Sequence, residues 1–459
     1  MTDSLFSTLP LPEPLLDNLQ SLGFAAMTPI QQESLPVILA GQDVIAKAKT
    51  GSGKTLAFAI NLLTRIHPED FCCQGLVLCP TRELATQVAS ETRRVARYLP
   101  NIKVVTLCGG QPIGPQIGSL AHGAHIVVGT PGRIQDHLRK GTLSLKKVNT
   151  LVLDEADRML DMGFINSINT IVSYTHSQRQ TLLYSATYPT SIRGLSQHIQ
   201  KRPVEVTISA TDQHTHIDQQ FYLAENNDKP EVLLKLLGDL HDSSAVIFCN
   251  TKKTCKDVGT VLFEQGYKPL VLHGDLAQKE RDQMLVRFAN RSSRLLIATD
   301  VAARGLDIDD LAAVINYDLS RDPEIHVHRI GRTGRAGKSG KALSLYTSRE
   351  QYKLDAISDY LQCALTRLSP DTLKKHTGNP EPAPMVTLCI DGGRKHKVRP
   401  GDILGALTGE GAIAGDQVGK ITVFDFVAYV AITREYARRA LQRLEKGKIK
   451  GRQFKVRRL

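Results

Sequence analysis

The sequence has no apolar run long enough to cross a membrane, and its first residues lack the basic and apolar regions of a secretory signal peptide. We therefore expect a cytoplasmic protein with no membrane partner, and no obligate protein partner is evident. None of the 8 cysteines pairs at metal-ligand spacing, and most lie in apolar runs. This pattern predicts reduced thiols in a core rather than a zinc site.

Acidic residues are scarce at one end of the chain. Residues 385–459 contain 16 Lys and Arg against 7 Asp and Glu, whereas the preceding 384 residues contain 42 against 39. Most of the net charge of +12 therefore lies in the last sixth of the sequence. The asymmetry favours a module that binds a polyanion, with a solvated basic surface as the alternative.

A glycine-rich loop follows an expected strand at residues 43–47 and precedes an apolar helix at 56–66. Its glycines free the backbone so that N–H groups can surround phosphate oxygens. Lys54 can reach the outer phosphates, and the Thr55 hydroxyl can bind Mg²⁺. Ala48 stands where the general pattern has glycine. The loop comprises Ala48, Lys49, Thr50, Gly51, Ser52, Gly53, Lys54 and Thr55.

A cluster of carboxylates ends the apolar run at residues 151–153. Asp154 and Glu155 follow this expected strand directly, and Asp157 comes two residues later. Crowded carboxylates repel one another unless a cation lies between them, and Mg²⁺ shared with phosphate oxygens is the usual solution. The glycine-rich loop and this cluster therefore predict the two halves of one ATP–Mg²⁺ site.

Further short apolar runs alternate with helical segments and predict an open parallel α/β sheet. Small and polar residues follow these runs. A row of hydroxyl, guanidinium and backbone N–H groups at one sheet edge suits a phosphodiester backbone, although each residue alone fits ordinary turn chemistry. The row consists of Thr81, Arg82, Gly110, Thr130 and Arg133.

A second strand–helix alternation begins after a polar segment. It contains no second glycine-rich loop of the kind found at residues 48–55, which we call the phosphate loop. It carries Thr299 at the end of an expected strand and an arginine-rich segment at 328–335. Three arginines at spacing three, interleaved with glycines, are suited to meeting an anion rather than to building a core. A solvated basic loop is the alternative reading.

The last 75 residues have the expected order β-α-β-β-α-β, which predicts a module similar to an RNA recognition motif (RRM). We expect Phe424 and Phe426 at the turn between its middle strands. Its best candidates for RNA contacts are the loop residues Arg394, Lys395, Lys397, Lys448, Lys450 and Arg452. The predicted organisation is an ATP-binding domain (1–206), a linker (207–218), a second α/β domain (219–368), a linker (369–384) and the basic module (385–459).

Together these motifs resemble those of the DEAD-box ATP-dependent RNA helicases over about residues 6–365. Asp154 to Asp157 match the motif that names the family, and the loop matches the family's own form, Ala48 included. Residues 28–31, 185–187, 300–307 and 328–335 match further motifs in the right order. The resemblance implies two tandem RecA-like domains, ATP and Mg²⁺ as cofactors, and RNA as partner.

The resemblance also implies roles for single residues. Gln31 reads adenine beside Phe6 and Phe24, Asp154 holds Mg²⁺, and Glu155 activates water. In the second domain Arg332 and Arg335 act as arginine fingers, and Asp307 approaches the ribose. The coupling residues are Asp157, Ser185, Thr187 and His328, and the RNA track is Thr81, Arg82, Gly110, Thr130, Arg133 and Thr299.

The basic C-terminal module resembles that of the DbpA branch of the family, through residues 387–393 and 401–407. That branch implies RNA-dependent ATPase activity directed to a 23S rRNA hairpin during assembly of the large ribosomal subunit. Three alternatives stay open on the sequence alone. They are a DNA helicase that shares the site, an assembly factor in which ATP only times release, and an ATPase independent of RNA.

Overall fold

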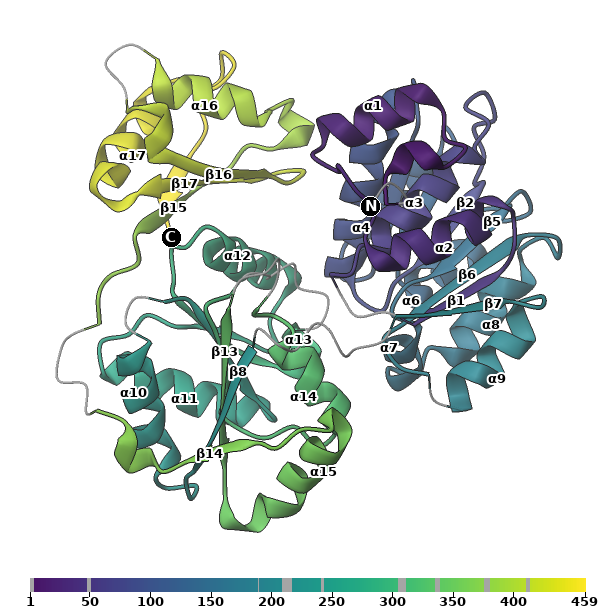
Figure 1. Ribbon diagram of the computed structural model, residues 1–459. Coiled ribbons are helices and arrows are strands. Elements are labelled where there is room, and N and C mark those ends of the chain that lie inside the picture. Colours follow the sequence, from purple (N-terminus) through teal and green to yellow (C-terminus); the bar gives the residue numbers. More distant parts are fainter. Residues whose placement is uncertain are drawn as a thin grey trace. The chain divides into compact units, whose positions relative to one another are not determined.

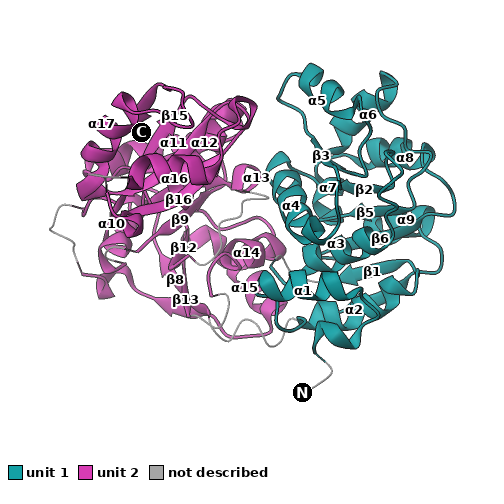
Figure 2. Ribbon diagram, turned by 90° about the horizontal axis from the view of Figure 1, so that it is seen from above, with its two compact units in different colours: residues 1–212, 305–307 teal, residues 213–304, 308–459 magenta. Residues whose placement is uncertain are grey.

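The computed structural model describes residues 4–47, 51–188, 190–208, 217–240, 243–303, 311–334, 339–374, 380–409 and 413–459. The described residues between 1 and 212 form one compact unit, and those between 213 and 459 form a second (Figure 2). Within the described ranges no helix has both the length and the hydropathy needed to span a membrane. The cysteines, all in described segments, are free thiols as predicted.

The first unit contains a sheet of seven described strands, all parallel, in the order β3-β4-β2-β5-β6-β1-β7. The strands are β1 (Val44–Lys47), β2 (Gly75–Leu78), β3 (Val104–Leu107), β4 (Ile126–Gly129), β5 (Thr150–Leu153), β6 (Gln180–Ser185) and β7 (Val204–Thr207). The helices are α1 (Glu13–Ser21), α2 (Pro29–Leu39), α3 (Lys54–Thr64), α4 (Arg82–Val95), α5 (Ile113–Leu120), α6 (Pro131–Arg139), α7 (Ala156–Asp161), α8 (Ile165–Ser173) and α9 (Thr190–Ile199).

Helices cover both faces of this sheet, which explains why its inner strands are apolar throughout. Alternate strand residues such as Val77 and Val152 pack with α1 to α4 on one face. Their neighbours, such as Leu76 and Leu151, pack with α6 to α9 on the other. The result is the doubly wound, three-layer arrangement that the sequence predicts (Figure 1).

The second unit repeats this architecture in residues 217–368, with parallel strands in the order β10-β11-β9-β12-β13-β8-β14. The strands are β8 (Ile217–Leu223), β9 (Ala245–Cys249), β10 (Leu270–Leu272), β11 (Leu295–Thr299), β12 (Ala313–Asn316), β13 (Gly340–Tyr346) and β14 (Thr366–Leu368). The helices are α10 (Lys229–Asp239), α11 (Lys252–Glu264), α12 (Gln278–Ala289), α13 (Asp300–Ala303), α14 (Pro323–Ile330) and α15 (Gln351–Leu361).

The same unit ends in a small antiparallel sheet with the order β16-β17-β15-β18. Its elements are β15 (Met385–Ile390), α16 (Pro400–Thr408), β16 (Val418–Val423), β17 (Ala428–Thr433), α17 (Ala437–Lys446) and β18 (Val456–Arg458). This is the predicted β-α-β-β-α-β order. Phe424 and Phe426 lie between β16 and β17, as expected.

The two faces of this small sheet have different partners. Along β15 and β17, residues such as Leu388 and Val430 pack with α16 and α17 in the module's own core. The alternate residues Cys389 and Tyr429 pack instead with Val286 of α12. Tyr429 is therefore only 1% exposed, and the sheet face that an RRM commonly offers to RNA is covered by the preceding α/β domain.

Hydrogen bonds reinforce this packing. Thr387 of β15 is fully buried, and its hydroxyl oxygen accepts from Nδ2 of Asn290 at 3.1 Å and lies 2.7 Å from the Ser292 hydroxyl. Both partners follow the end of α12. The module is thus joined to the second α/β domain by buried side chains as well as by the segment 369–384, which the sequence predicts to be a linker.

The predicted fold class, two RecA-like parallel sheets followed by a small α+β domain, is confirmed. The sequence did not indicate β7, β8 or β14. β8 begins at Ile217, inside the range expected to be a linker. The sequence does not indicate this strand because its first half contains the polar run 218–220, and its side chains are buried only from Phe221. Short or half-polar strands near a sheet edge lack the continuous apolar run that identifies the inner strands.

Candidate ATP and RNA sites

The candidate site residues of the first unit follow the carboxyl ends of its strands. Parallel strands bring these ends to one edge of the sheet. Lys54 and Asp154 come after β1 and β5, and Asp157 contacts the segment after β6. Thr81, Gly110 and Thr130 come after β2, β3 and β4. The strand order therefore places the expected nucleotide residues and the expected RNA residues in two neighbouring halves of this edge.

The phosphate loop has the backbone its glycines predict. Gly51 and Gly53 have φ of 83° and 96°, in the left-handed region that side chains disfavour. α3 begins at Lys54, so its N-terminus, the positive end of the helix dipole, directly follows the loop. Lys54 is buried at the start of this helix. Ala48, Lys49 and Thr50 lie outside the described residues.

Gln31 holds the phosphate loop by its side-chain amide. Its Oε1 accepts from the Thr28 backbone N–H at 2.9 Å, and its Nε2 donates to the Gly53 carbonyl at 2.9 Å. The first bond is one half of a capping box at the start of α2, a pattern that Thr28-x-x-Gln31 carries in the sequence. Gln31 is thus a structural bridge from α2 to the loop, and its reading of adenine stays a prediction. Phe6 and Phe24 pack in the same hydrophobic cluster.

Asp154 is suited to a hard cation. It is 3% exposed, and its Oδ1 has no hydrogen-bond partner in the described part of the chain. Burial raises the pKa of this carboxyl to about 6; Lys54 opposes the rise and Glu155 adds to it. A buried carboxylate oxygen without a donor, beside a lysine and further carboxylates, fits a cation shared with phosphate.

Glu155 and Arg158 form a buried ion pair, with Nη1 of Arg158 3.0 Å from Oε2 of Glu155. Glu155 also has a left-handed backbone, with φ of 54° at the start of α7. Such a conformation is costly for a residue with a side chain, and it recurs at catalytic positions. Glu155 therefore follows Asp154 in a strained turn, and its carboxylate is paired with Arg158 in this structure.

Asp157 joins α7 to the end of β6. Its Oδ2 accepts from the backbone N–H groups of Ala186 and Thr187 at 3.2 and 3.1 Å, and from the Thr187 hydroxyl at 3.1 Å. Its Oδ1 accepts from the Arg158 N–H at 3.0 Å. The Ser185 hydroxyl donates to the Thr187 carbonyl at 2.6 Å. The structure thus brings together three of the four predicted coupling residues.

The RNA row is also assembled. The Arg82 guanidinium packs on the turn at Gly110, where a Cβ atom would overlap it and where φ is 71°. Thr81 begins α4, and its hydroxyl accepts from the Leu84 N–H at 3.3 Å. Nη2 of Arg133 donates to the Gln111 carbonyl at 2.9 Å. Arg133 belongs to α6, and Thr130 is the N-cap residue of that helix and is 9% exposed.

In the second unit Arg329 is the hub of a buried network. Its Nε and Nη2 donate to both carboxylate oxygens of Asp300 at 2.6 and 2.7 Å, and its Nη1 donates to the Asp318 carbonyl at 2.6 Å. Nη2 also donates to Asn250 Oδ1 at 2.9 Å. The prediction that all three arginines of 328–335 are presented to an anionic ligand is therefore wrong for Arg329, which is 2% exposed and pairs with a carboxylate of the protein itself.

The remaining predicted residues of this unit lie on neighbouring elements. Thr299 ends β11, directly before Asp300, and His328 precedes Arg329 on α14. Arg332 follows α14 and is 7% exposed. The Asp300–Arg329 pair consequently ties the expected RNA residue Thr299 to the helix that bears His328. Asp307 and Arg335 lie outside the described residues.

The loops of the C-terminal module form one cationic face. Backbone N–H groups of Arg394 and Lys395 donate to the carbonyls of Phe424 and Asp425 at 2.9 and 2.8 Å. Nζ of Lys450 donates to the Lys397 carbonyl at 3.2 Å, which joins the two basic loops. All six predicted RNA residues of this module are exposed: Arg394, Lys395, Lys397, Lys448, Lys450 and Arg452.

Aromatic rings lie within the same face. The His396 ring meets the rings of Phe426 and Phe454 edge to face, at centroid distances of 6.1 and 5.8 Å. Phe426 is 62% exposed. An exposed ring among cations is a suitable platform for an unstacked base. The sequence placed Phe426 at the turn but gave no sign of its partners.

Comparison with known proteins identifies the family. Residues 28–195 match the DEAD/DEAH box helicase model, and residues 228–337 match the helicase conserved C-terminal domain. The chain is 53% identical over 453 residues to the ATP-dependent RNA helicase DbpA of Escherichia coli, covering 98% of this chain and 99% of that protein. It is a DEAD-box RNA helicase of the DbpA type. RNA-dependent ATP hydrolysis and RNA helicase activity follow from this membership.

Two further findings complete the comparison. Residues 387–458 match the DbpA RNA binding domain. S. cerevisiae Dbp5 bound to RNA and ADP BeF3 shares 32% identity at a TM-score of 0.73, covering 80% of this chain and 96% of that one. Mss116p bound to single-stranded RNA and AMP-PNP shares 27% identity at 0.73, covering 80% and 79%. The family thus binds ATP and RNA, as the sequence predicts.

Proposed function

We propose that this helicase is directed to 23S rRNA by its C-terminal module and acts during assembly of the large ribosomal subunit, locally unwinding short duplexes. The match of residues 387–458 to the DbpA RNA binding domain carries this proposal. The exposed cations around Phe426 support it, because they offer phosphate contacts and a stacking surface on one face. The RRM-type sheet face is covered, so RNA binds through these loops.

ATP binds on the phosphate loop at residues 48–55, with Gln31, Phe6 and Phe24 at the adenine. The buried Lys54 meets the outer phosphates, and Glu155 orients and deprotonates the attacking water. For this the Glu155 carboxylate must turn from Arg158 toward the water. The Asp154 Oδ1 and the Thr55 hydroxyl would hold Mg²⁺, which supplies charge for the phosphate oxygens.

Closure of the two RecA-like domains completes the catalytic groups. Arg332 and Arg335 then act as arginine fingers, which can be worth about 10³–10⁵ in rate, and Asp307 approaches the ribose. RNA lies on the row of Thr81, Arg82, Gly110, Thr130 and Arg133, continued by Thr299. Because RNA and ATP favour the same closed state, each raises the affinity for the other, and His328 and Asp157 link the two sites.

Binding of a 23S rRNA hairpin by a charge-removal variant tests the targeting. We expect R394Q/K395Q/K397Q to lose preference for the hairpin over unrelated RNA of equal length. The slope of log affinity against log salt should fall by about 1 for each lost phosphate contact. RNA-stimulated ATPase activity with generic RNA should persist, because the helicase domains are unchanged.

The matched control removes as many charges from the same module. Arg438, Arg439 and Lys446 are exposed and belong to α17 rather than to the basic loops. R438Q/R439Q/K446Q should keep the preference for the hairpin. If both triple variants keep it, or if the parent protein has none, the proposed targeting is wrong.

A further inference from the structure

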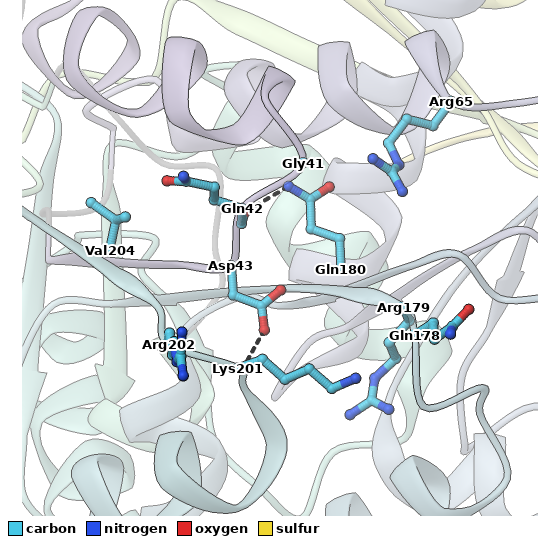
Figure 3. A pocket seen from close by; sticks show the side chains of 10 residues that line it. All are labelled: Gly41, Gln42, Asp43, Arg65, Gln178, Arg179, Gln180, Lys201, Arg202 and Val204. Atoms are coloured by element: carbon cyan, nitrogen blue, oxygen red, sulfur yellow. Dashed lines mark hydrogen bonds between the residues drawn. The ribbon is translucent and has the colours of Figure 1, made fainter.

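The first domain has a cavity at the edge of its sheet opposite the ATP and RNA residues. It has a volume of about 390 Å³ and lies where β6, β1 and β7 begin. Its walls come from the turn 41–43, the segment 178–180 and the turn 201–204, with Arg65 at the end of α3 (Figure 3). The proposed roles in ATP hydrolysis and RNA binding use none of these residues.

The lining is strongly cationic. Arg65, Arg179, Lys201 and Arg202 line the cavity together with a single carboxylate, that of Asp43. That carboxylate is engaged with the backbone, since one oxygen accepts from the Thr181 N–H and the other from the Lys201 N–H, both at 2.7 Å. Asp43 therefore fixes the shape of the cavity and leaves its positive charge in excess.

Two arginines of the lining have only part of their hydrogen-bonding capacity satisfied. The Nε atoms of Arg65 and Arg179 are buried and have no hydrogen-bond partner among the described residues. Nη1 and Nη2 of Arg179 donate to the carbonyls of His176 and Ile199 at 3.2 and 3.1 Å. These bonds hold the guanidinium at the end of α9 and explain its position. The Arg179 Nε stays without a partner among the described residues, and Lys201 is exposed at the rim of the cavity.

We propose that this cavity binds a small oligophosphate, with pyrophosphate as the shortest suitable anion. Clustered guanidinium and ammonium groups match an anion with several charges and many acceptor oxygens. A terminal phosphate carries about −1.5 to −2 charge at neutral pH, against −1 for each phosphodiester of RNA. Because three turns and Arg65 bound the cavity, it suits a compact anion better than a continuous strand.

The proposal has a structural consequence. A bound oligophosphate offsets the repulsion among the four cations and links the starts of β6, β1 and β7. The other end of β1 leads into the phosphate loop. Oligophosphate should therefore stabilise the domain without occupying the nucleotide site.

Calorimetric titration of the full-length protein with sodium pyrophosphate tests this inference. No divalent cation is added, and G53A, whose added Cβ would overlap the Gln31 amide and should abolish nucleotide binding, is titrated in parallel so that uptake of the probe by the phosphate loop can be subtracted. We expect one equivalent of pyrophosphate to bind. In K201Q/R202Q, which removes two exposed cations from the rim, the affinity should fall by about tenfold or more because two charge-assisted contacts are lost.

The control variant K146Q/K147Q removes two adjacent exposed lysines next to β5, at the same edge of the same sheet. Its pyrophosphate affinity should equal that of the parent. No binding beyond the nucleotide site, or an equal loss in both double variants, would overturn the proposal. Displacement of pyrophosphate by a short single-stranded RNA in the parent protein would also overturn it, because the cavity would then belong to the RNA surface.

Discussion

At the residue scale, three neighbouring carboxylates of one motif have three different environments. Asp154 has an unpartnered buried oxygen, Glu155 is paired with Arg158, and Asp157 accepts hydrogen bonds from the segment after β6. These environments match a cation ligand, a movable base and a fixed link. The division explains how adjacent residues of like charge can serve ATP and RNA separately.

Replacing Asp157 by Asn should disturb coupling more than ATP binding. The amide can keep some of the contacts to Thr187, but it loses the charge that serves several donors. Truncation to Ala would leave buried N–H groups unpaired, at a cost of about 1–3 kcal/mol. In measurements on the same D157N sample, RNA-stimulated ATP hydrolysis should fall more than the affinity for ATP.

The control for this prediction is D161N, on the exposed side of the same helix. It should leave both quantities unchanged. If D157N lowers the affinity for ATP but keeps the stimulation of hydrolysis by RNA, Asp157 belongs to the nucleotide site and the assignment fails.

Arg329 should be a determinant of stability. Its removal leaves Asp300 without its bidentate partner and leaves the Asn250 and Asp318 oxygens without a donor. Breaking a buried ion pair in this way costs about 3–5 kcal/mol. Urea unfolding of R329A, followed by a probe of the second unit, measures the loss.

Arg321 is exposed close by and provides the comparison. R321A should unfold like the parent protein. A denaturation midpoint of R329A equal to that of R321A would show that the network contributes nothing, contrary to its burial.

At the element scale, the phosphate loop depends on the close approach of α2. A Cβ on Gly53 would overlap the Gln31 amide and lie 2.9 Å from the Thr28 hydroxyl, at a φ of 96°. G53A should therefore lose ATP binding, and the strained backbone costs about 1–3 kcal/mol. Nucleotide titration and thermal unfolding measure both effects.

Gly194 of α9 gives the opposite expectation. Nothing lies within 4 Å of a Cβ there, and the residue is helical. G194A should keep ATP binding and stabilise the domain by about 0.5–1 kcal/mol. If the two alanine variants behave alike, the contact between α2 and the loop is not what constrains Gly53.

The sequence predicted the inner elements well and the outer ones poorly. Strands such as β2 and β9 are apolar on both faces because helices cover both, and this run is visible in one sequence. β8 contains the polar residues 218–220, so it lacks the apolar run that would identify it as a strand. Packing of Tyr429 against Val286 joins segments distant in sequence, so no local pattern indicates it.

In the candidate site, too, the sequence indicates local motifs but not contacts between distant segments. Residues with a recognisable motif, such as Lys54 and Asp154, were predicted from spacing alone. The Arg158 partner of Glu155 and the network of Arg329 depend on which oxygens lie within reach, which only the folded chain decides. The cavity around Arg179 joins three strand starts and carries no motif.

At the scale of the whole molecule, charge and function are divided along the chain. The helicase domains are nearly neutral, whereas residues 385–459 carry 16 Lys and Arg against 7 Asp and Glu. We therefore expect electrostatic binding to RNA to be concentrated in the C-terminal module and to weaken steeply with salt. Specificity and hydrolysis can then be measured apart, by changing salt and RNA separately.

The most direct test of the account is the ATPase rate of the full-length protein with 23S rRNA, 16S rRNA and an unrelated RNA at one salt concentration. We predict that 23S rRNA stimulates ATP hydrolysis most strongly and does so at the lowest RNA concentration. Without RNA, turnover should be negligible. Equal stimulation by all three RNAs would contradict the proposed targeting. Full turnover without RNA would contradict the coupling itself.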